Sequence, residues 1–442
     1  MNKKNLKTKN EEKFNIQMIS IIVCSVINTI VGLFSGTFLV ASLYNAGGNP
    51  IVVIAEYYLV VYVAILVFYY ILSHFGENVK IREWFFRIGI ILKAIHIFMI
   101  VLMNDKFYTY IILFAVIRGI SDAFYWSSYS LMRYSIVRRK MVNKFTFVEQ
   151  FSGKTASIVF PIILGSLIDV ESFVKVAFPV LILSIIQIIF SFFVRSNEVK
   201  SSKFDIFAYW KKIKEQKHNK QFAKIYMSFF IDGTRDAITQ MITIFIMMFY
   251  NSSNTSLGII SSIISICSLV ILLIYTACQS IKNSKITYIL MCVLPFVSCL
   301  FLIFNPCKMT LIIYNICFSV VSSLLTYGLD TERISIVKLL KYHGETLEHN
   351  VTSEIFLDNG RFVSYIIMLL IGLFGGENTL VLFRISLLFY IVMFIIVNVL
   401  NYILAKDYNS ILEKHKKEKA KEQEFQQNNV STENKNLNNE KQ

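Results

Sequence analysis

Charged side chains stand inside several long apolar runs of this chain, and two groups of them have helical spacing. Arg118 and Asp122 are four residues apart, so a helix would place them on one face. Asp232, Arg235 and Asp236 follow one another at spacings of three and four. A carboxylate beside an arginine can pair with it, or take up a proton and free the arginine for an anionic group. The alternative is a buried ion pair that only fixes helix packing.

Other polar or aromatic residues of the apolar runs could also do chemistry. Glu56 has no basic neighbour in sequence, which suits either a proton-titrating site or a residue at a water-filled mouth. Trp126 belongs to an aromatic cluster that could stack on an apolar ligand or simply pack. Lys93 and His96 share a helix face, and we expect packed, interfacial or water-lined positions for them.

The elements that carry these residues follow from composition. Of the 442 residues, 55% are hydrophobic and only 17% are charged, whereas a soluble protein carries about a quarter charged residues. The apolar runs reach about 20 residues, enough for a helix to cross a ~30 Å hydrocarbon core. This pattern excludes soluble, fibrous and disordered proteins, and it lacks the ten-residue alternation of membrane β-barrels. We predict an all-α polytopic membrane protein with twelve helices near 18–44, 51–73, 85–103, 107–131, 148–168, 174–194, 221–250, 256–278, 286–304, 309–329, 353–374 and 379–404.

Basic residues give the predicted orientation. Between these helices and in the tails, 33 Lys and Arg residues fall on one side and three on the other. The positive-inside rule then places both termini in the cytoplasm of a multi-pass protein of the bacterial cytoplasmic membrane. The net charge of +15 is therefore a topology signal and an attraction for anionic lipids, and we expect no nucleic-acid partner.

The two halves of the chain resemble each other. Residues 133–137 read Arg-Tyr-Ser-Ile-Val and residues 333–337 read Arg-Ile-Ser-Ile-Val, while Gly-Lys-x-x-Ser at 153–157 matches Gly-Arg-x-x-Ser at 360–364. Gly165 and Gly372 follow these motifs at the same spacing. We therefore predict two parallel six-helix repeats. The predicted organisation is an N-terminal tail (1–17), a six-helix bundle (18–194), a basic central loop (195–220), a second six-helix bundle (221–404) and a charged, partly disordered tail (405–442).

Ionic residues also recur on the predicted cytoplasmic side. Glu354, Asp358 and Arg361 form one stripe of helix 353–374, and Glu149 and Lys154 occupy the corresponding helix of the first half. We interpret these residues as a cytoplasmic gate whose ion pairs break as the halves rock. Interfacial salt bridging is the alternative.

This organisation resembles the major facilitator superfamily over residues 18–404. The run Arg118-Gly-Ile-Ser-Asp122 is similar to a helix 4 segment of that family, and Glu354 to Arg361 to an element of bacterial members. The resemblance implies two pseudo-symmetric bundles around a cavity lined by helices 1, 4, 7 and 10. It thereby implies a substrate or proton pathway through Glu56, Arg118, Asp122, Trp126, Asp232, Arg235 and Asp236.

The expected function is secondary-active transport of a small molecule by alternating access, with proton coupling as one option and with export favoured. The sequence has no GxxxxGK[ST] stretch, which disfavours an ATP-driven pump, and no HExxH motif, which argues against a zinc enzyme. Because the charges lie at middle depth in both halves rather than around a cleft at one membrane face, we expect a transporter and no enzyme, catalytic residue, metal or cofactor. The expected partners are a small-molecule substrate, protons or another coupling ion and the lipid bilayer, with a monomeric protein. The alternative is a lipid-modifying enzyme or a non-transporting sensor on the same fold.

Overall fold

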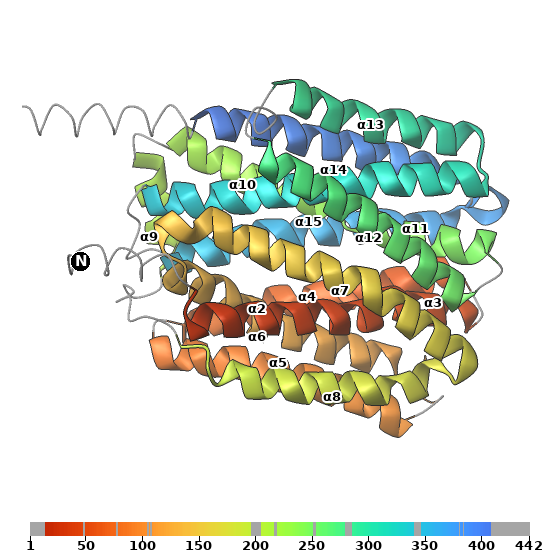
Figure 1. The fold of residues 1–442 in the computed structure, drawn as a ribbon, viewed down its shortest axis with the longest axis horizontal. Helices are drawn as coiled ribbons and strands as arrows, with labels where there is room; N and C mark the ends of the chain where they lie inside the picture. The colour runs from red at the N-terminus through yellow and green to blue at the C-terminus, as the bar shows by residue number, and fades with distance from the viewer. Residues whose placement is uncertain are drawn as a thin grey trace, which may run out of the picture.

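Long helices running side by side along one axis make up the protein (Figure 1). The computed structural model describes residues 14–46, 49–76, 78–103, 106, 108–195, 205–215, 219–250, 253–278, 285–339, 346–379, 381–382 and 384–407. No strand occurs within these ranges. The helices are α2 (Ile16–Leu33), α3 (Leu39–Asn45), α4 (Pro50–Ser73), α5 (Val79–Met103), α6 (Ile111–Ile136), α7 (Val142–Val170), α8 (Phe173–Ser191), α9 (Ile206–Glu215), α10 (Asn219–Thr234), α11 (Ala237–Phe249), α12 (Asn254–Ala277), α13 (Lys285–Phe304), α14 (Lys308–Leu339), α15 (Thr346–Phe374) and a last helix, Arg384–Asp407.

The predicted fold class is confirmed. Within the described ranges, 11 helices are long and apolar enough to cross a membrane. The predicted helix 221–250 is the twelfth, but it is not continuous, because α10 ends at Thr234 and α11 begins at Ala237. A π-helical segment, Phe34–Phe38, joins α2 to α3 within the first span. Both interruptions fall deep in the bundle, where irregular backbone is tolerated only beside protein or a cavity.

Several predicted boundaries fall short of the observed ones. Helices α5, α7 and α15 begin six or seven residues before the predicted starts, at Val79, Val142 and Thr346. Helix α14 ends at Leu339, well beyond the predicted 329. Hydropathy detects the part of a helix that suits hydrocarbon, while the backbone hydrogen bonds continue into the polar region beyond it.

The central loop 195–220 contains a helix that the sequence analysis missed. In α9, Tyr209 and Ile213 lie four residues apart, and both are buried against Phe222 and Tyr226 of α10. With 10 residues, this helix is too short to stand out in a hydropathy window of about 19 residues. Most of the two tails, 1–13 and 408–442, lies outside the described residues.

Side-chain caps start several of the spans. Asn15 accepts a hydrogen bond from the backbone N of Met18, and Ser253 accepts one from Ser256 N. Asn49 caps α4, with Pro50 at its first position. These caps satisfy helix donors that would otherwise be unpaired. They fix where the chain enters each span.

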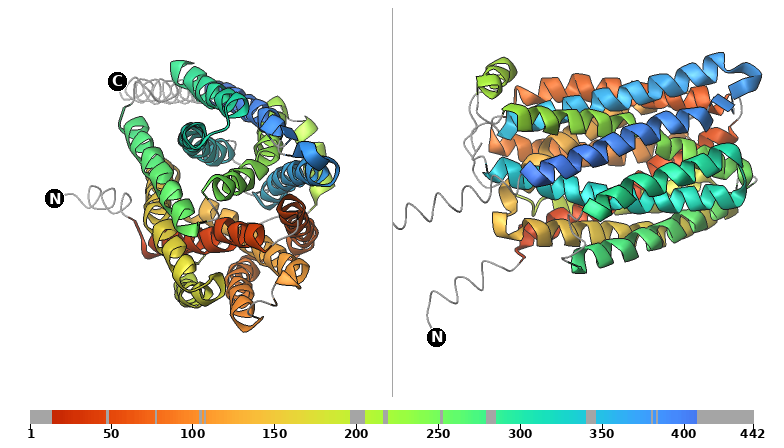
Figure 2. Two further views of the ribbon diagram at one scale, coloured as in Figure 1. Left: turned by 90° about the vertical axis from the view of Figure 1, so that its right-hand side faces the viewer. Right: turned by 90° about the horizontal axis from the view of Figure 1, so that it is seen from above.

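The outer surface of the bundle is apolar and its interior holds polar groups. Large side chains such as Ile185, Ile189 and Ile263 are exposed, whereas Arg87, Lys93 and Asp358 are buried. An apolar surface together with charged groups buried inside fits a lipid-facing exterior. We call the end of the bundle near Phe14, α9 and the α6–α7 turn the basic end. The other end, with the α7–α8 and α11–α12 turns, is the far end (Figures 1 and 2).

Two helix pairs make the most extensive contacts between the first half of the chain and the second, α7 with α12 and α4 with α15. A Cβ at Gly165 would collide with the Asn254 backbone at the start of α12, and one at Gly372 would collide with Val52 at the start of α4. The glycines matched in the sequence repeat therefore make equivalent close contacts in the two halves.

Candidate functional site

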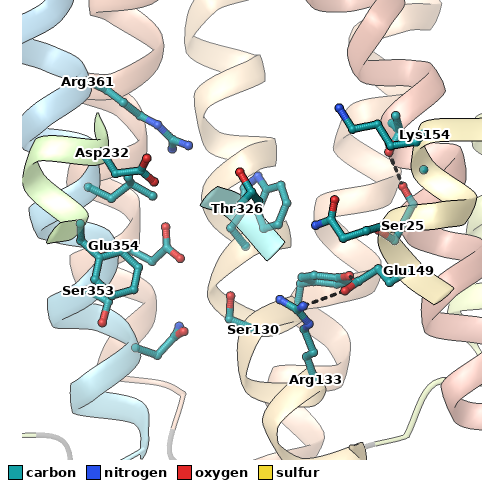
Figure 3. A pocket seen from close by; sticks show the side chains of 18 of the residues that line it. Ser25, Ser130, Arg133, Glu149, Lys154, Asp232, Thr326, Ser353, Glu354 and Arg361 are labelled. Atoms are coloured by element: carbon teal, nitrogen blue, oxygen red, sulfur yellow. Dashed lines mark hydrogen bonds and ion pairs between the residues drawn. The ribbon is translucent and has the colours of Figure 1, made fainter. Parts of the chain in front are cut away.

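A cavity of about 470 Å³ lies between the two halves in the basic-end part of the bundle, and we call it the basic-end cavity. Helices α6 and α7 line one side, and α10 and α15 line the other. Figure 3 shows Glu149 and Lys154 facing Asp232, Glu354 and Arg361 across it. With Trp126, which also lines it, six of the predicted site residues therefore meet at one cavity.

A second cavity, of about 420 Å³, continues from the first and is called the central cavity. The two share Gln150, Lys154, Ser157 and Thr326 as lining residues. Most of the central cavity's lining side chains carry a hydroxyl or an amide, and they come from the π-helical segment of the first span and from α7, α11, α12 and α14. Both halves of the chain therefore contribute to both cavities.

A smaller space of about 160 Å³, the side cavity, is lined by Lys93, His96, Arg118 and Asp122. Trp126 lines it together with the basic-end cavity. The polar contacts around Arg118 and Asp122 therefore stand beside the cavities rather than in a dry core.

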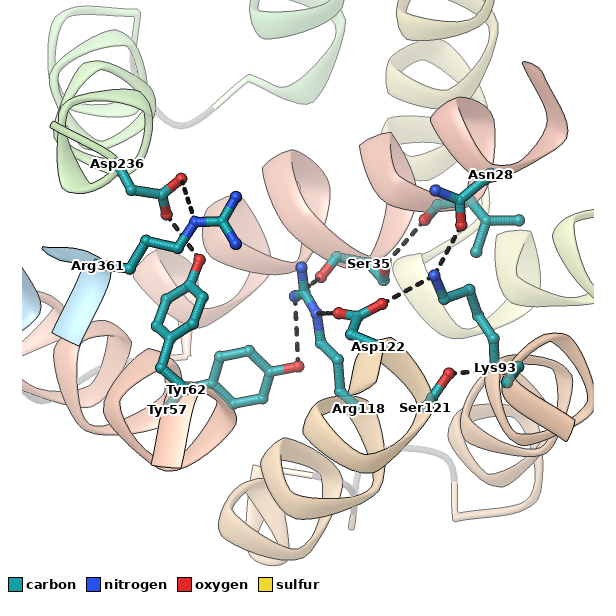
Figure 4. A network of polar contacts seen from close by, with 12 residues as sticks. Asn28, Ser35, Tyr57, Tyr62, Lys93, Arg118, Ser121, Asp122, Asp236 and Arg361 are labelled. Atoms are coloured by element: carbon teal, nitrogen blue, oxygen red, sulfur yellow. Dashed lines mark hydrogen bonds and ion pairs between the residues drawn. The ribbon is translucent and has the colours of Figure 1, made fainter. Parts of the chain in front are cut away.

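Arg118 has polar partners on its own helix, on the first span and on α4 (Figure 4). Its Nε lies 3.7 Å from Asp122, and its Nη1 donates to the Ser35 carbonyl and, at 3.5 Å, to the Tyr57 hydroxyl. Ser35 belongs to the π-helical segment of the first span. Such segments redirect backbone carbonyls and are common at functional sites.

Lys93, for which we expected a packed, interfacial or water-lined position, lines the side cavity and joins this network. Its Nζ lies 2.9 Å from Asp122 and donates to Asn28 at 2.7 Å. One carboxylate thus lies between two cations. The ion pair between Lys93 and Asp122 links α5 to α6. In the sequence, the only indication of this pair was a lysine without a counter-charge in the span before that of Asp122.

In the second half, the break between α10 and α11 separates charges that a continuous helix would align. Arg235 pairs with Asp232 at 2.7 Å and donates to Ser322 of α14 at 3.1 Å. Asp236 instead faces Arg361 of α15, whose Nε lies 3.7 Å away. The three residues therefore do not act on one shared face as expected. Asp232 and Arg235 pair with each other, whereas Asp236 is turned toward α15.

Asp236 also connects the two halves of the chain. The Tyr62 hydroxyl of α4 donates to its Oδ2 at 2.7 Å, and the Tyr365 hydroxyl of α15 donates at 3.1 Å. The Tyr58 ring stacks on Tyr365 with centroids 4.8 Å apart. These tyrosines lie in apolar runs, and the sequence analysis did not single them out. The only indication in the sequence was the phenol hydroxyl of each tyrosine, which needs a hydrogen-bond partner when it is buried.

The residues expected to form a gate have several different partners. Glu149 pairs with Arg133 at 2.7 Å, and Asp358, 1% exposed, pairs with Arg361 at 2.8 Å. Glu354 lines the basic-end cavity. No ion pair joins Lys154 to any of these carboxylates in the described part of the chain.

Glu56 lies apart from the other candidates. It is exposed and is not among the described lining residues of the three cavities. Its two expected roles, a proton-titrating site or a residue at a water-filled mouth, both stay predictions.

Comparisons with known proteins identify the architecture. The human organic anion transporter MFSD10 superposes with a TM-score of 0.56, over 86% of this chain and 98% of its own, at 10% identity. A point mutant of the nucleoside transporter NupG gives a TM-score of 0.55, over 90% and 100%, at 15% identity. This chain has the major facilitator fold.

Sequence comparison adds a relative without extending the functional evidence. The Bacillus subtilis (strain 168) protein YqgE, itself uncharacterized, is 24% identical over 359 residues, which cover 78% of this chain and 81% of YqgE. No family model matches the chain. The major facilitator fold is therefore shown by the arrangement of the helices alone.

Proposed function

We propose that this protein is a secondary-active transporter that moves a small molecule by alternating access, with the basic-end and central cavities as its path. One observation carries the proposal: both cavities lie between the halves, while at the far end α7 directly contacts the start of α12 and the start of α4 directly contacts α15. A carrier that opens to one side at a time needs this asymmetry. The proposed site comprises the charged residues that line or adjoin these cavities.

The far end is held by a carboxylate that caps a helix of the other half. Asp169, in α7, accepts hydrogen bonds from the backbone N of Thr255 at 2.8 Å and of Asn254 at 3.1 Å. The Asn254 side chain donates to it at 2.9 Å and Ser253 at 3.3 Å. These residues begin α12, where unpaired N–H groups and the helix dipole favour a negative charge. Opening the far end would have to break this clamp.

Helices α4 and α15 remain in contact at both ends. Asn49 donates to the Gly372 carbonyl at 2.9 Å near the far end, and Asn350 donates to the Tyr69 hydroxyl at 3.0 Å near the basic end. A contact that spans the whole length can act as the pivot about which two rigid halves rock. We propose that the basic end faces the bacterial cytoplasm and that the monomer is the working unit.

Asp236 is the proposed proton-coupling carboxylate. It accepts from Tyr62 of the first half and pairs with Arg361 of the second, so rocking the halves changes its surroundings. Loss of the tyrosine donor would favour the protonated form of the carboxyl group. Protonation would in turn remove one of the two carboxylate partners of Arg361, which lines the basic-end cavity and would keep its pair with Asp358.

The test locks the far end with a reversible cross-link. In a background without the seven cysteines, Asp169→Cys and Thr255→Cys place two thiols at the clamp, for joining by a short bis-methanethiosulfonate reagent. Proteoliposomes incubated with a metabolite extract are washed, and mass spectrometry identifies the solutes they retain. We expect cross-linking to reduce retention of at least one solute tenfold or more, and reduction of the cross-link to restore it.

Each single-cysteine variant, treated with the same reagent, is the control. Asp236→Asn should keep binding but lose the response to an imposed pH gradient. Equal retention with and without the cross-link would refute alternating access. Lipid modification in the same vesicles, without solute retention, would favour an enzyme.

A further inference from the structure

Lys154 differs from the other cations that line the cavities. Near the middle of α7, it lines both the basic-end and the central cavity. Within the described part of the chain, no carboxylate forms an ion pair with it, whereas Arg133 pairs with Glu149 and Arg361 pairs with both Asp236 and Asp358. A lysine held inside a membrane bundle without a counter-charge is costly. Its position therefore suits an anion that enters from outside.

The central cavity supplies a chemical setting for that anion. Lys154 is its one charged lining residue among those described, and no described carboxylate lines it. Hydroxyl side chains from the first span and from α11, α12 and α14 surround the same space, among them Thr37, Thr239, Thr243, Ser261, Ser265 and Ser323. Thr243 and Ser323 donate to carbonyls of their own helices and keep the capacity to accept, whereas a hydroxyl without such a bond can both donate and accept hydrogen bonds. The cavity therefore combines one positive charge with hydrogen-bonding walls.

Asn315 adds a donor that has no internal partner. It lines the central cavity and is 2% exposed, and its buried Nδ2 has no hydrogen-bond partner among the described residues. A buried donor left unpaired costs about 1–3 kcal/mol. A small rotation of this side chain toward the cavity would let a bound acceptor remove that cost.

We propose that the central cavity binds a small hydroxylated organic monoanion, a carboxylate, with Lys154 as its counter-charge. This rests on the proposed transport function and names its substrate class. A single unpaired lysine neutralises one negative charge, whereas a dianion would leave net charge in a poorly hydrated site. The hydroxyl walls favour a polar carbon skeleton over an apolar one.

The competing role for Lys154 is a gate cation that pairs with Glu354 across the basic-end cavity when that cavity closes (Figure 3). A gate cation affects closure and flux without distinguishing an anionic solute from its neutral analogue. Binding measured at equilibrium therefore separates the two roles.

The experiment is calorimetric titration of the purified full-length protein with matched probes. Gluconate and glycerate carry a carboxylate and hydroxyls, glucitol and glycerol carry hydroxyls only, and hexanoate carries a carboxylate only. We expect the hydroxylated anions to bind at least tenfold more tightly than their neutral analogues or hexanoate. Lys154→Gln should weaken them tenfold or more, and Lys154→Arg should retain most of the affinity.

Lys224→Gln is the matched control, because Lys224 pairs with Asp407, 2.7 Å away, and lines none of the described cavities. It should leave the affinity unchanged. Any one of three results would overturn the assignment. These are equal affinity for charged and neutral probes, no binding of either hydroxylated anion, and no effect of Lys154→Gln on the affinity. The titration requires no flux, so lysine-dependent binding together with a failed vesicle assay would refute transport and leave this binding site standing.

Discussion

Asp122 shows how one residue can decide the charge balance of a membrane interior. It lies 2.9 Å from Lys93 and 3.7 Å from Arg118, so one carboxylate pairs with both cations. Removing a cation leaves a neutral pair, whereas removing the carboxylate leaves two like charges together. The two substitutions therefore have unequal effects, although each deletes one charge.

We expect Asp122→Asn to destabilise the protein by about 3 kcal/mol, the usual cost of stranding a buried charge. Lys93→Met should cost less than half as much, since Arg118 keeps its partner. In the double variant, Lys93→Met should recover part of the loss caused by Asp122→Asn. Thermal unfolding of the purified variants measures this cycle. Strictly additive losses would show that the three groups are not coupled.

At the scale of elements, the break between α10 and α11 has its own supporting contacts. The backbone N of Ala237, the first residue of α11, donates to Ser364 Oγ at 3.1 Å. Asp236, immediately before it, is held by Tyr62, Tyr365 and Arg361. A helix interrupted in a bilayer must satisfy its freed backbone groups within the protein. Here α15 supplies much of that support.

Ser364→Ala should therefore destabilise the protein by about 1–2 kcal/mol, because a buried backbone donor loses its acceptor. It should also speed hydrogen exchange at the Ala237 amide. The control is Ser157→Ala at the matching repeat position, where the hydroxyl donates to the Gly153 carbonyl of its own helix. Unfolding midpoints and exchange mass spectrometry check both. Equal effects of the two substitutions would argue against a supported break.

For the whole molecule, the basic residues predict which end faces the cytoplasm. Glu171 lies in the α7–α8 turn at the far end with a half-exposed side chain, and Lys211 is exposed on α9 at the basic end. In a cysteine-free background, Glu171→Cys should react with an impermeant maleimide in intact cells. Lys211→Cys should react only after permeabilisation. The reverse pattern would invert the proposed topology.

Hydropathy alone was enough to predict the fold class, because a span of apolar residues must form a helix wherever lipid offers no hydrogen bonds. It also marked Arg118, Asp122, Asp236 and Arg361, because charge in such a span is costly and conspicuous. The repeat of Gly165 and Gly372 pointed to equivalent contacts that the structure contains.

Which charges meet depends on how the helices pack, and no sequence pattern predicted it. Lys93 pairs with Asp122 from another helix, and Asp236 turns to Tyr62 and Arg361, because packing and the helix break set these distances. Periodicity reports the face a residue occupies on its own helix and carries no information on what faces it from a helix distant in sequence. For the same reason, the lack of an ion pair at Lys154 among the described residues became visible only when the helices were assembled around the cavities.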